Sequence, residues 1–269
     1  MELRDELALR GYRYVWRRAE DAVAEVGRIA LMIRDVILGF VPAMRSFSLV
    51  VQQMQTIGVG SLGLVAVVSL FTGAVAAVQA AYQFSDVVPM KYLGAVIVRS
   101  VVIELGPVLT ALVVGGRVGA SIAAELGTMR VTEQIDALEV MAINPVRYLV
   151  VPRIAASLAM LPVVTVFANA IAIFGGWIVA ISVIGVSSHT YVLGLKEFFH
   201  MNDLYSSLLK AFFFGGIIGT MGCYYGFTAE GGAEGVGLAT TRAVVASCVL
   251  VLISDYVLAN VLLRLIFAS

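Results

Sequence analysis

Four charged residues that lie inside long apolar segments are the first candidates for chemistry in this sequence. They are Arg99, Glu104, Lys210 and Asp255. Charged side chains are costly in the hydrocarbon core of a bilayer, and they usually face a bundle interior or an aqueous cavity. With a helical rise of about 1.5 Å per residue, all four fall in the outer half of the membrane. We expect them to form a structural ion-pair network, the polar part of a substrate path, or both.

The lysines of the chain exclude an ATP-binding P-loop. That motif reads Gly-x-x-x-x-Gly-Lys-Ser/Thr, because backbone amides and the lysine together cradle the phosphates. Lys91, Lys196 and Lys210 each follow a methionine or a leucine instead of glycine. The chain therefore lacks this machinery, and we predict no cofactor on the chain itself.

Two histidines offer the other possible chemistry, and neither lies within an apolar segment. His189 and His200, with Glu197 and Asp203 nearby, could contact a metal ion. Their spacing matches no standard metal site, so we expect a solvated loop with no metal. Since no histidine stands inside a span, an intramembrane protease is also poorly supported. We predict no catalytic residues and no enzyme activity on this chain.

A charged segment over about residues 131–142 has the features of a short docking helix. Thr132 is expected to cap it, with acid in the first turn, and Asn144-Pro145 is expected to end it. The segment predicts an amphipathic helix that either docks in a cleft on a motor subunit or lies on the membrane. Its apolar stripe comprises Val131, Ile135, Leu138 and Ala142. The candidate contact residues are Glu125, Arg130, Thr132, Glu133, Gln134, Asp136, Glu139 and Met141.

Four glycines, spaced by four, three and four residues, share one face of a later apolar segment. Another backbone can approach such a face closely. We expect it to pack within one subunit, with a homodimer seam as the alternative. The glycines are Gly215, Gly219, Gly222 and Gly226.

These residues must be positioned by membrane-spanning helices. The chain is 60% hydrophobic and only 13% charged, whereas a soluble domain has about 25% charged residues. Its net charge of zero gives no indication of a nucleic-acid partner. Because about 20 apolar residues cross a bilayer, we predict an all-α integral membrane protein with five spans. They run over Gly58–Phe84, Tyr92–Leu126, Leu149–Ile184, Tyr205–Phe227 and Ala243–Phe267, with kink sites at Gly106-Pro107 and Pro162.

The N-terminal part of the chain, residues 1–57, differs from the permease domain predicted over residues 58–269. It combines eight arginines with apolar residues at helical spacing, such as Val26, Ile29 and Ile33. This pattern favours amphipathic helices in the headgroup region, with a soluble cytoplasmic helix pair as the alternative. Lys and Arg are concentrated in this part and in the loops on the same predicted side, which indicates a cytoplasmic N-terminus.

Several stretches closely resemble the MlaE family of permeases. They are ELGPVLTALVVGGRVGASIAAELGTMRVTEQIDALEVMAINP from Glu104, VVPR ending at Arg153, ATTRAVV over residues 239–245 and SDYVLAN around Asp255. That family comprises the permeases of ABC transporters that move phospholipids with MCE-domain partner proteins. The resemblance covers the chain from about Gly58 to its end.

The resemblance implies a homodimer in the bacterial inner membrane, with two ATPase subunits inside and an MCE-protein assembly outside. ATP and Mg²⁺ would bind to the ATPase, and the helix over about residues 131–142 would couple it to the spans. Glu104, Lys210 and Asp255 match charged positions of the family near the lipid cavity. One position departs from the pattern: members commonly have Arg before the Glu-Leu-Gly-Pro run, and this chain has Ile103. Arg99 stands one turn earlier.

Two other classes of protein compete with the ABC permease. In an ion-coupled secondary transporter, Glu104 and Asp255 would be proton or ion sites. Such proteins often contain inverted repeats, into which five spans do not divide evenly. A membrane scaffold that anchors an outer protein without transport is the other alternative.

Overall fold

The computed structural model describes residues 16, 20, 23–40, 47–84 and 89–267. Most of the predicted N-terminal region before residue 23 therefore lies outside the described residues. The part that is described is helical and contains no strand, which confirms the all-α class. Five helices are long and apolar enough to cross a membrane, as predicted. They run over Phe47–Gln83, Met90–Val131, Val146–Ser182, Met201–Phe227 and Gly232–Leu262.

The spans are built from shorter elements, because several contain irregular turns. The first combines α2 (Phe47–Ile57), the 3-10 turn η2 (Val59–Ser61) and α3 (Leu62–Gln83). The second comprises η3 (Met90–Tyr92), α4 (Leu93–Ser100), η4 (Val101–Leu105), α5 (Gly106–Val114), η5 (Gly115–Gly119) and α6 (Ala120–Val131), in which η4 and η5 are π-helical. Then follow α7 (Gln134–Val140), the π-helical η6 (Val146–Val150), α8 (Val151–Ser182), α9 (Ser188–Phe198), α10 (Met201–Phe227) and α11 (Gly232–Phe267).

Two boundaries differ most from the sequence prediction. The first long helix begins at Phe47 instead of Gly58, since only the short turn η2 separates α2 from α3. The fifth begins at Gly232 instead of Ala243. In both cases the helix begins before its apolar stretch, and hydropathy alone does not detect these additional residues.

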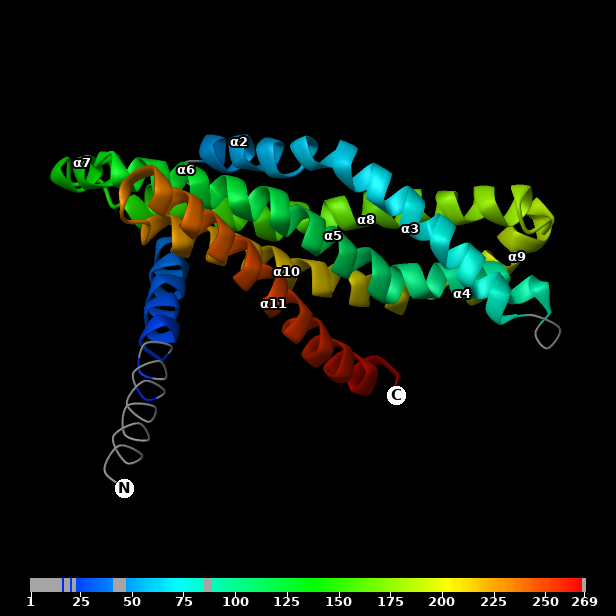
Figure 1. The fold of residues 1–269 in the computed structure, drawn as a ribbon. Helices are drawn as coiled ribbons and strands as arrows, with labels where there is room; N and C mark the ends of the chain where they lie inside the picture. The colour runs from blue at the N-terminus through cyan, green and yellow to red at the C-terminus, as the bar shows by residue number, and fades with distance from the viewer. Residues whose placement is uncertain (1–15, 17–19, 21–22, 41–46, 85–88, 268–269) are drawn as a thin grey trace, which may run out of the picture.

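The spans run along one axis, as Figure 1 shows. One end of the bundle carries α7, the start of α2 and the start of α11, and the opposite end carries α9 and the start of α4. Helix α11 diverges from the bundle toward the C-terminus. The N-terminal helix over residues 23–40 stands across the axis, with exposed Val26, Ile33 and Ile37. This orientation and exposed apolar surface fit a helix in the membrane interface.

The four predicted glycines of α10 let neighbouring helices of the same chain approach closely. A Cβ at Gly215 or Gly219 would meet Ser157 of α8. A Cβ at Gly226 would come within 2.7 Å of the Leu126 Cβ on α6, and Gly222 also faces α6. Helix α10 therefore packs between α8 and α6 through this face. A second close approach, missed in the sequence, joins Gly73 of α3 to the backbone of α8.

The two predicted kink sites behave differently. Before Pro107, the chain forms the π-helical turn η4, in which the Gly106 N–H donates to the Val101 carbonyl five residues earlier. Pro162, by contrast, lies inside α8, which continues without interruption from Val151 to Ser182.

Candidate functional site

Lys210 joins three spans at the centre of the candidate site. Its side chain is 1% exposed, and Nζ lies 2.7 Å from Glu104 Oε1 and 2.9 Å from Asp255 Oδ1. It also donates to the Ile103 carbonyl at 3.3 Å. The ammonium thus donates one hydrogen bond to the backbone and forms ion pairs with two carboxylates. Three of the four predicted intramembrane charges therefore form one cluster, which we call the Lys210 cluster (Glu104, Lys210 and Asp255).

The Glu-Leu-Gly-Pro run explains why Lys210 reaches a backbone carbonyl. In a regular α-helix the Ile103 carbonyl would accept from the N–H of residue 107, which is proline and has none. The ammonium of Lys210 supplies the missing donor. The local π turn and the buried cation are thus two consequences of one proline.

The Lys210 cluster carries one negative charge more than positive charge. Both carboxylates use the same ammonium, but their surroundings differ: Glu104 is 44% exposed and Asp255 is 20% exposed. Glu104 therefore keeps an accessible side while its other side is fixed by Lys210. Removal of the lysine would leave two carboxylates without a cation in a low-dielectric setting, which is strongly unfavourable.

Arg99, the fourth predicted charge, belongs to a separate ion pair. Its Nε lies 3.3 Å from Asp203 Oδ2 at the start of α10. Asp203 is only 2% exposed, whereas Arg99 is 41% exposed. The sequence analysis placed Asp203 in a solvated loop, and this was wrong. Its spacing of seven from Lys210 was the available signal, since residues seven apart share a helix face.

A groove with a volume of about 870 Å³ runs between α3 and the second span, with Glu104 on its wall. Its other polar lining residues are Thr72, Gln79, Gln83 and Ser100, and the rest of the lining is apolar. A second hollow of about 500 Å³ lies beside it, lined by Arg99 and by the rings of Phe84, Tyr92 and Phe198. Val96 and Ser100 line both spaces, so the two are contiguous.

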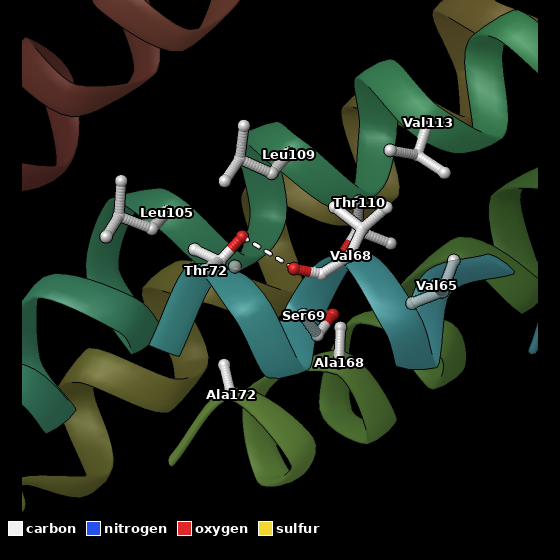
Figure 2. Close-up of a pocket in the computed structure, with 11 residues that line it drawn as sticks. Val65, Val68, Ser69, Thr72, Leu105, Leu109, Thr110, Val113, Ala168 and Ala172 are labelled. Atoms are coloured by element: carbon white, nitrogen blue, oxygen red, sulfur yellow. Dashed lines mark hydrogen bonds between the residues drawn. The ribbon is translucent and has the colours of Figure 1, made fainter. Parts of the chain in front are cut away.

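Behind the groove, α3, α5 and α8 pack tightly. Figure 2 shows Leu105 and Leu109 of the second span near Thr72 of α3, with Ala168 and Ala172 of α8 beneath. The space left among these helices is about 10 Å³, too small for more than about one water molecule. The Thr72 hydroxyl donates to the Val68 carbonyl at 2.8 Å, so it is satisfied within its own helix. The groove therefore has a closed floor.

The predicted docking helix is present as α7, but its start differs from the prediction. Thr132 does not cap it: Thr132 ends α6, and its hydroxyl donates to the Thr128 carbonyl at 2.8 Å. Glu133 is the residue before α7, in a left-handed conformation with φ 61°, and it makes no side-chain cap. Gln134 Nε2 donates to the Thr132 hydroxyl at 3.0 Å. A tight turn thus replaces the Thr132 cap that the sequence suggested.

The end of α7 also lies earlier than predicted. The helix ends at Val140, because Ala142 adopts a left-handed conformation with φ 58°. The Ile143 N–H donates to the Leu138 carbonyl at 2.9 Å and closes the turn. Asn144 acts on the next element, where its Oδ1 accepts from the Arg147 N–H at 3.2 Å. The Asn-Pro pair therefore precedes η6 and does not end α7.

Helix α7 presents an apolar and acidic outer surface at one end of the bundle. Ile135 is buried and Leu138 packs on the core, so half of the predicted stripe faces inward. Val140 is 87% exposed and Met141 61% exposed. The exposed acidic and amide residues beside them are Glu133, Gln134, Asp136 and Glu139.

Three of the predicted contact residues form ion pairs within the chain. Arg130 pairs with Asp136 across the turn between α6 and α7. Glu125 Oε1 lies 2.7 Å from Nη2 of Arg153, which is buried on α8. These pairs fix the position of α7 relative to the second and third spans, and Glu125 keeps a half-exposed side chain.

The segment predicted as a solvated loop around His189 is instead the helix α9, which packs on α4. Ser187 caps it, with its Oγ accepting from the Thr190 N–H at 3.1 Å. Tyr191 is buried and donates to the Ile173 carbonyl at 3.2 Å, and burial raises its pKa to about 12. Within residues 16, 20, 23–40, 47–84 and 89–267, no three His, Cys, Asp or Glu side chains are grouped as metal ligands would be.

The membrane spans, the buried charge cluster and the groove define a multi-pass membrane protein of the transport-permease class. The sequence model described as Permease MlaE matches residues 50–261, and the chain belongs to this family. It is a transport subunit.

Relatives of this kind occur in bacteria and plants. A probable ABC transporter permease protein of Rickettsia bellii is 38% identical over 250 residues, covering 93% of this chain and 96% of the relative. One of Synechocystis sp. is 39% identical over 207 residues, covering 77% and 79%. The chloroplastic protein TRIGALACTOSYLDIACYLGLYCEROL 1 of Arabidopsis thaliana is 33% identical over 248 residues, covering 92% and 69%.

Proposed function

We propose that this chain is the permease subunit of an ABC transporter that moves phospholipids between the bacterial inner membrane and an MCE-protein conduit. The observation that carries the proposal is the groove of about 870 Å³, which combines a long apolar lining with the exposed carboxylate of Glu104. A phospholipid has the same division into apolar chains and a charged headgroup. The Arabidopsis relative, whose name contains a galactolipid, adds support for a lipid substrate.

The surface of α7 supports the proposed ATPase partner. Val140 and Met141 expose apolar side chains next to the acids Glu133 and Glu139, and no neighbouring element among the described residues covers them. A cleft on an ATPase with apolar and basic residues would complement this surface. ATP and Mg²⁺ would bind there, on the partner chain.

We expect a second copy of the chain to pack over the groove and cover it. Val67, Phe71 and Val75 of α3 line the groove and are more than half exposed. A symmetric dimer that brings two such faces together would enclose a lipid path between the subunits. In such a complex the MCE-domain protein would receive lipid at the end of the bundle opposite α7.

Ion-coupled transport is less well supported by the geometry. Glu104 and Asp255 both contact the ammonium of Lys210, at 2.7 Å and 2.9 Å. Both carboxylates are therefore already paired with a cation of the chain itself, and neither is a vacant site for a coupling ion.

Copurification and reconstitution test the proposed function. The complex expressed with its ATPase should retain the ATPase in stoichiometric amounts and transfer labelled phospholipid between vesicles and an MCE-domain acceptor when ATP is added. The double variant Glu133→Lys, Glu139→Lys should release the ATPase. Glu230→Lys is the control, because Glu230 is an exposed acid two residues before α11, whose start lies at the same end of the bundle as α7 (Figure 1). Lipid movement by the purified chain with a proton gradient and no ATPase would contradict the proposal.

A further inference from the structure

The charges along the groove are unevenly distributed, and this distribution affects which phospholipid headgroup the groove can bind. Near Glu104, two carboxylates share the single ammonium of Lys210, so the groove wall carries excess negative charge. In the adjoining hollow, Arg99 is 41% exposed although Asp203 lies 3.3 Å from its Nε. The rest of its guanidinium is available beside the rings of Tyr92 and Phe198. An accessible anion and an accessible cation thus occupy neighbouring spaces.

The π turn η4 brings these two groups onto one side of the second span. Arg99 and Glu104 are five residues apart, which on a regular α-helix would direct them to different faces. A π turn is closed by a hydrogen bond between residues five apart, as from the Gly106 N–H to the Val101 carbonyl. It therefore rotates residue i+5 back toward the face of residue i. Ser100, which lines both spaces, lies between the two charges.

We propose that the groove prefers a phospholipid whose headgroup carries both a phosphate and a primary ammonium, with Arg99 binding the phosphate and Glu104 the ammonium. The inference rests on the proposed function and names the headgroup for the same groove. A guanidinium binds phosphate oxygens through paired N–H donors. The accessible face of Glu104 accepts from an ammonium, while an anionic headgroup without one meets uncompensated negative charge.

The apolar part of the groove favours a lipid over a soluble phosphate as the ligand. The exposed Arg99–phosphate pair alone binds weakly in water. The groove wall offers valines, Phe71, Leu105 and Leu109 to acyl chains, which a soluble phosphate lacks. The acyl chains therefore select a lipid, and the two charges set the headgroup preference.

Lipid retention measures this preference directly. The full-length chain, reconstituted with its partners in nanodiscs of equimolar phosphatidylethanolamine and phosphatidylglycerol, is extracted and its retained lipid is identified by mass spectrometry. We expect phosphatidylethanolamine to be enriched about two- to fivefold, the ratio that half-exposed ion pairs produce. Glu104→Gln should bring the ratio to that of the bilayer while lipid is still retained. Arg99→Gln should lower the retention of both phospholipids.

Asp255→Asn is the matched control, because it removes the same charge from the same lysine at a position that does not line the groove. It should lower the enrichment less than Glu104→Gln does, because it removes the excess negative charge but keeps the carboxylate that lines the groove. An equal loss in both variants would overturn a direct contact at Glu104. Equal retention of the two lipids by the unaltered complex would also overturn the preference, while leaving ATP-driven lipid movement intact. Displacement of the lipid by millimolar phosphoethanolamine would show a soluble ligand instead.

Discussion

The substitution Lys210→Met should destabilise the protein far more than neutralisation of either carboxylate beside it. Methionine keeps an unbranched side chain of similar length in the 1% exposed site, so packing changes little. It removes the cation from Glu104 and Asp255 and the donor from the Ile103 carbonyl. Removal of one partner from a buried ion pair costs about 3–5 kcal/mol. Here the orphaned carboxylate of Asp255, which is 20% exposed, accounts for most of the cost, and the half-exposed Glu104 adds less.

The two carboxylates should show smaller effects, ordered by their exposure. Glu104 is 44% exposed, so Glu104→Gln should cost about 1 kcal/mol or less. Asp255 is 20% exposed, and Asp255→Asn should cost more than Glu104→Gln but less than Lys210→Met. In each of these variants Lys210 retains one carboxylate and the Ile103 carbonyl.

The triple variant Lys210→Met, Glu104→Gln, Asp255→Asn separates charge from packing. It removes both orphaned charges, so it should recover most of the loss caused by Lys210→Met alone. The unsatisfied Ile103 carbonyl should keep a remaining cost of about 1–3 kcal/mol. Reversible unfolding in mixed detergent micelles measures each free energy of unfolding. If Lys210→Met costs no more than Glu104→Gln, or if the triple variant is the least stable of all, the electrostatic account of the cluster is wrong.

Two further predictions concern packing and pH. Gly226→Ala should cost about 1–3 kcal/mol through overpacking, because its Cβ would stand 2.7 Å from the Leu126 Cβ. Gly63→Ala should be neutral or slightly stabilising in the same unfolding assay, since nothing lies within 4 Å of its Cβ position; equal effects would contradict close packing of α10 on α6. Because burial raises the pKa of Tyr191 from 10.0 to about 12, the folded protein favours the neutral phenol, and its stabilising effect should be complete below pH 10 and be lost as the pH rises toward 12. Tyr191→Phe should remove this part of the alkaline destabilisation, and identical pH profiles of the two proteins would show that Tyr191 does not contribute.

The five spans, and the charged residues that lie within them, could be predicted from the sequence, because both depend on residues that are near one another along the chain. Hydropathy over about 20 residues depends only on composition, so five spans were evident. The pairing of Lys210 with both Glu104 and Asp255 was not evident, because it depends on how α10, η4 and α11 meet in space. Asp203 was misplaced for a related reason: it precedes the apolar part of its helix, and hydropathy does not detect that helix until later residues.

The errors around α7 have a different origin. A threonine followed by an acidic turn is a common start of a helix, yet here Thr132 closes α6 and Glu133 occupies a left-handed turn. The apolar pattern grouped Ile135 and Leu138 in a stripe expected to face a motor subunit or the membrane, but both pack on the core of the chain itself. The prediction of the end of α7 was wrong, because Ala142 adopts a left-handed conformation that is usually signalled in a sequence by glycine.

Three cations of this protein, the buried Lys210 and Arg153 and the exposed Arg117, donate to backbone carbonyls in or beside irregular turns of the spans. Every backbone carbonyl in a bilayer needs a donor, and non-α turns leave some without one. Lys210 donates to the Ile103 carbonyl in η4, and Arg153 donates to the Leu149 carbonyl in η6 at 2.8 Å. Arg117 donates to the Thr56 carbonyl, beside the turn η2, at 3.4 Å.

Each cation thus stabilises an irregular turn by donating to a carbonyl in or beside it. At η4, the irregular turn also positions a side chain of the groove. The π turn there directs Glu104 into the groove, while Lys210 satisfies the carbonyl that the turn leaves free. The structural and the substrate-path roles expected for these charges are therefore not alternatives at this position. The ion pair that stabilises the irregular turn is the same one that holds a carboxylate at the groove wall.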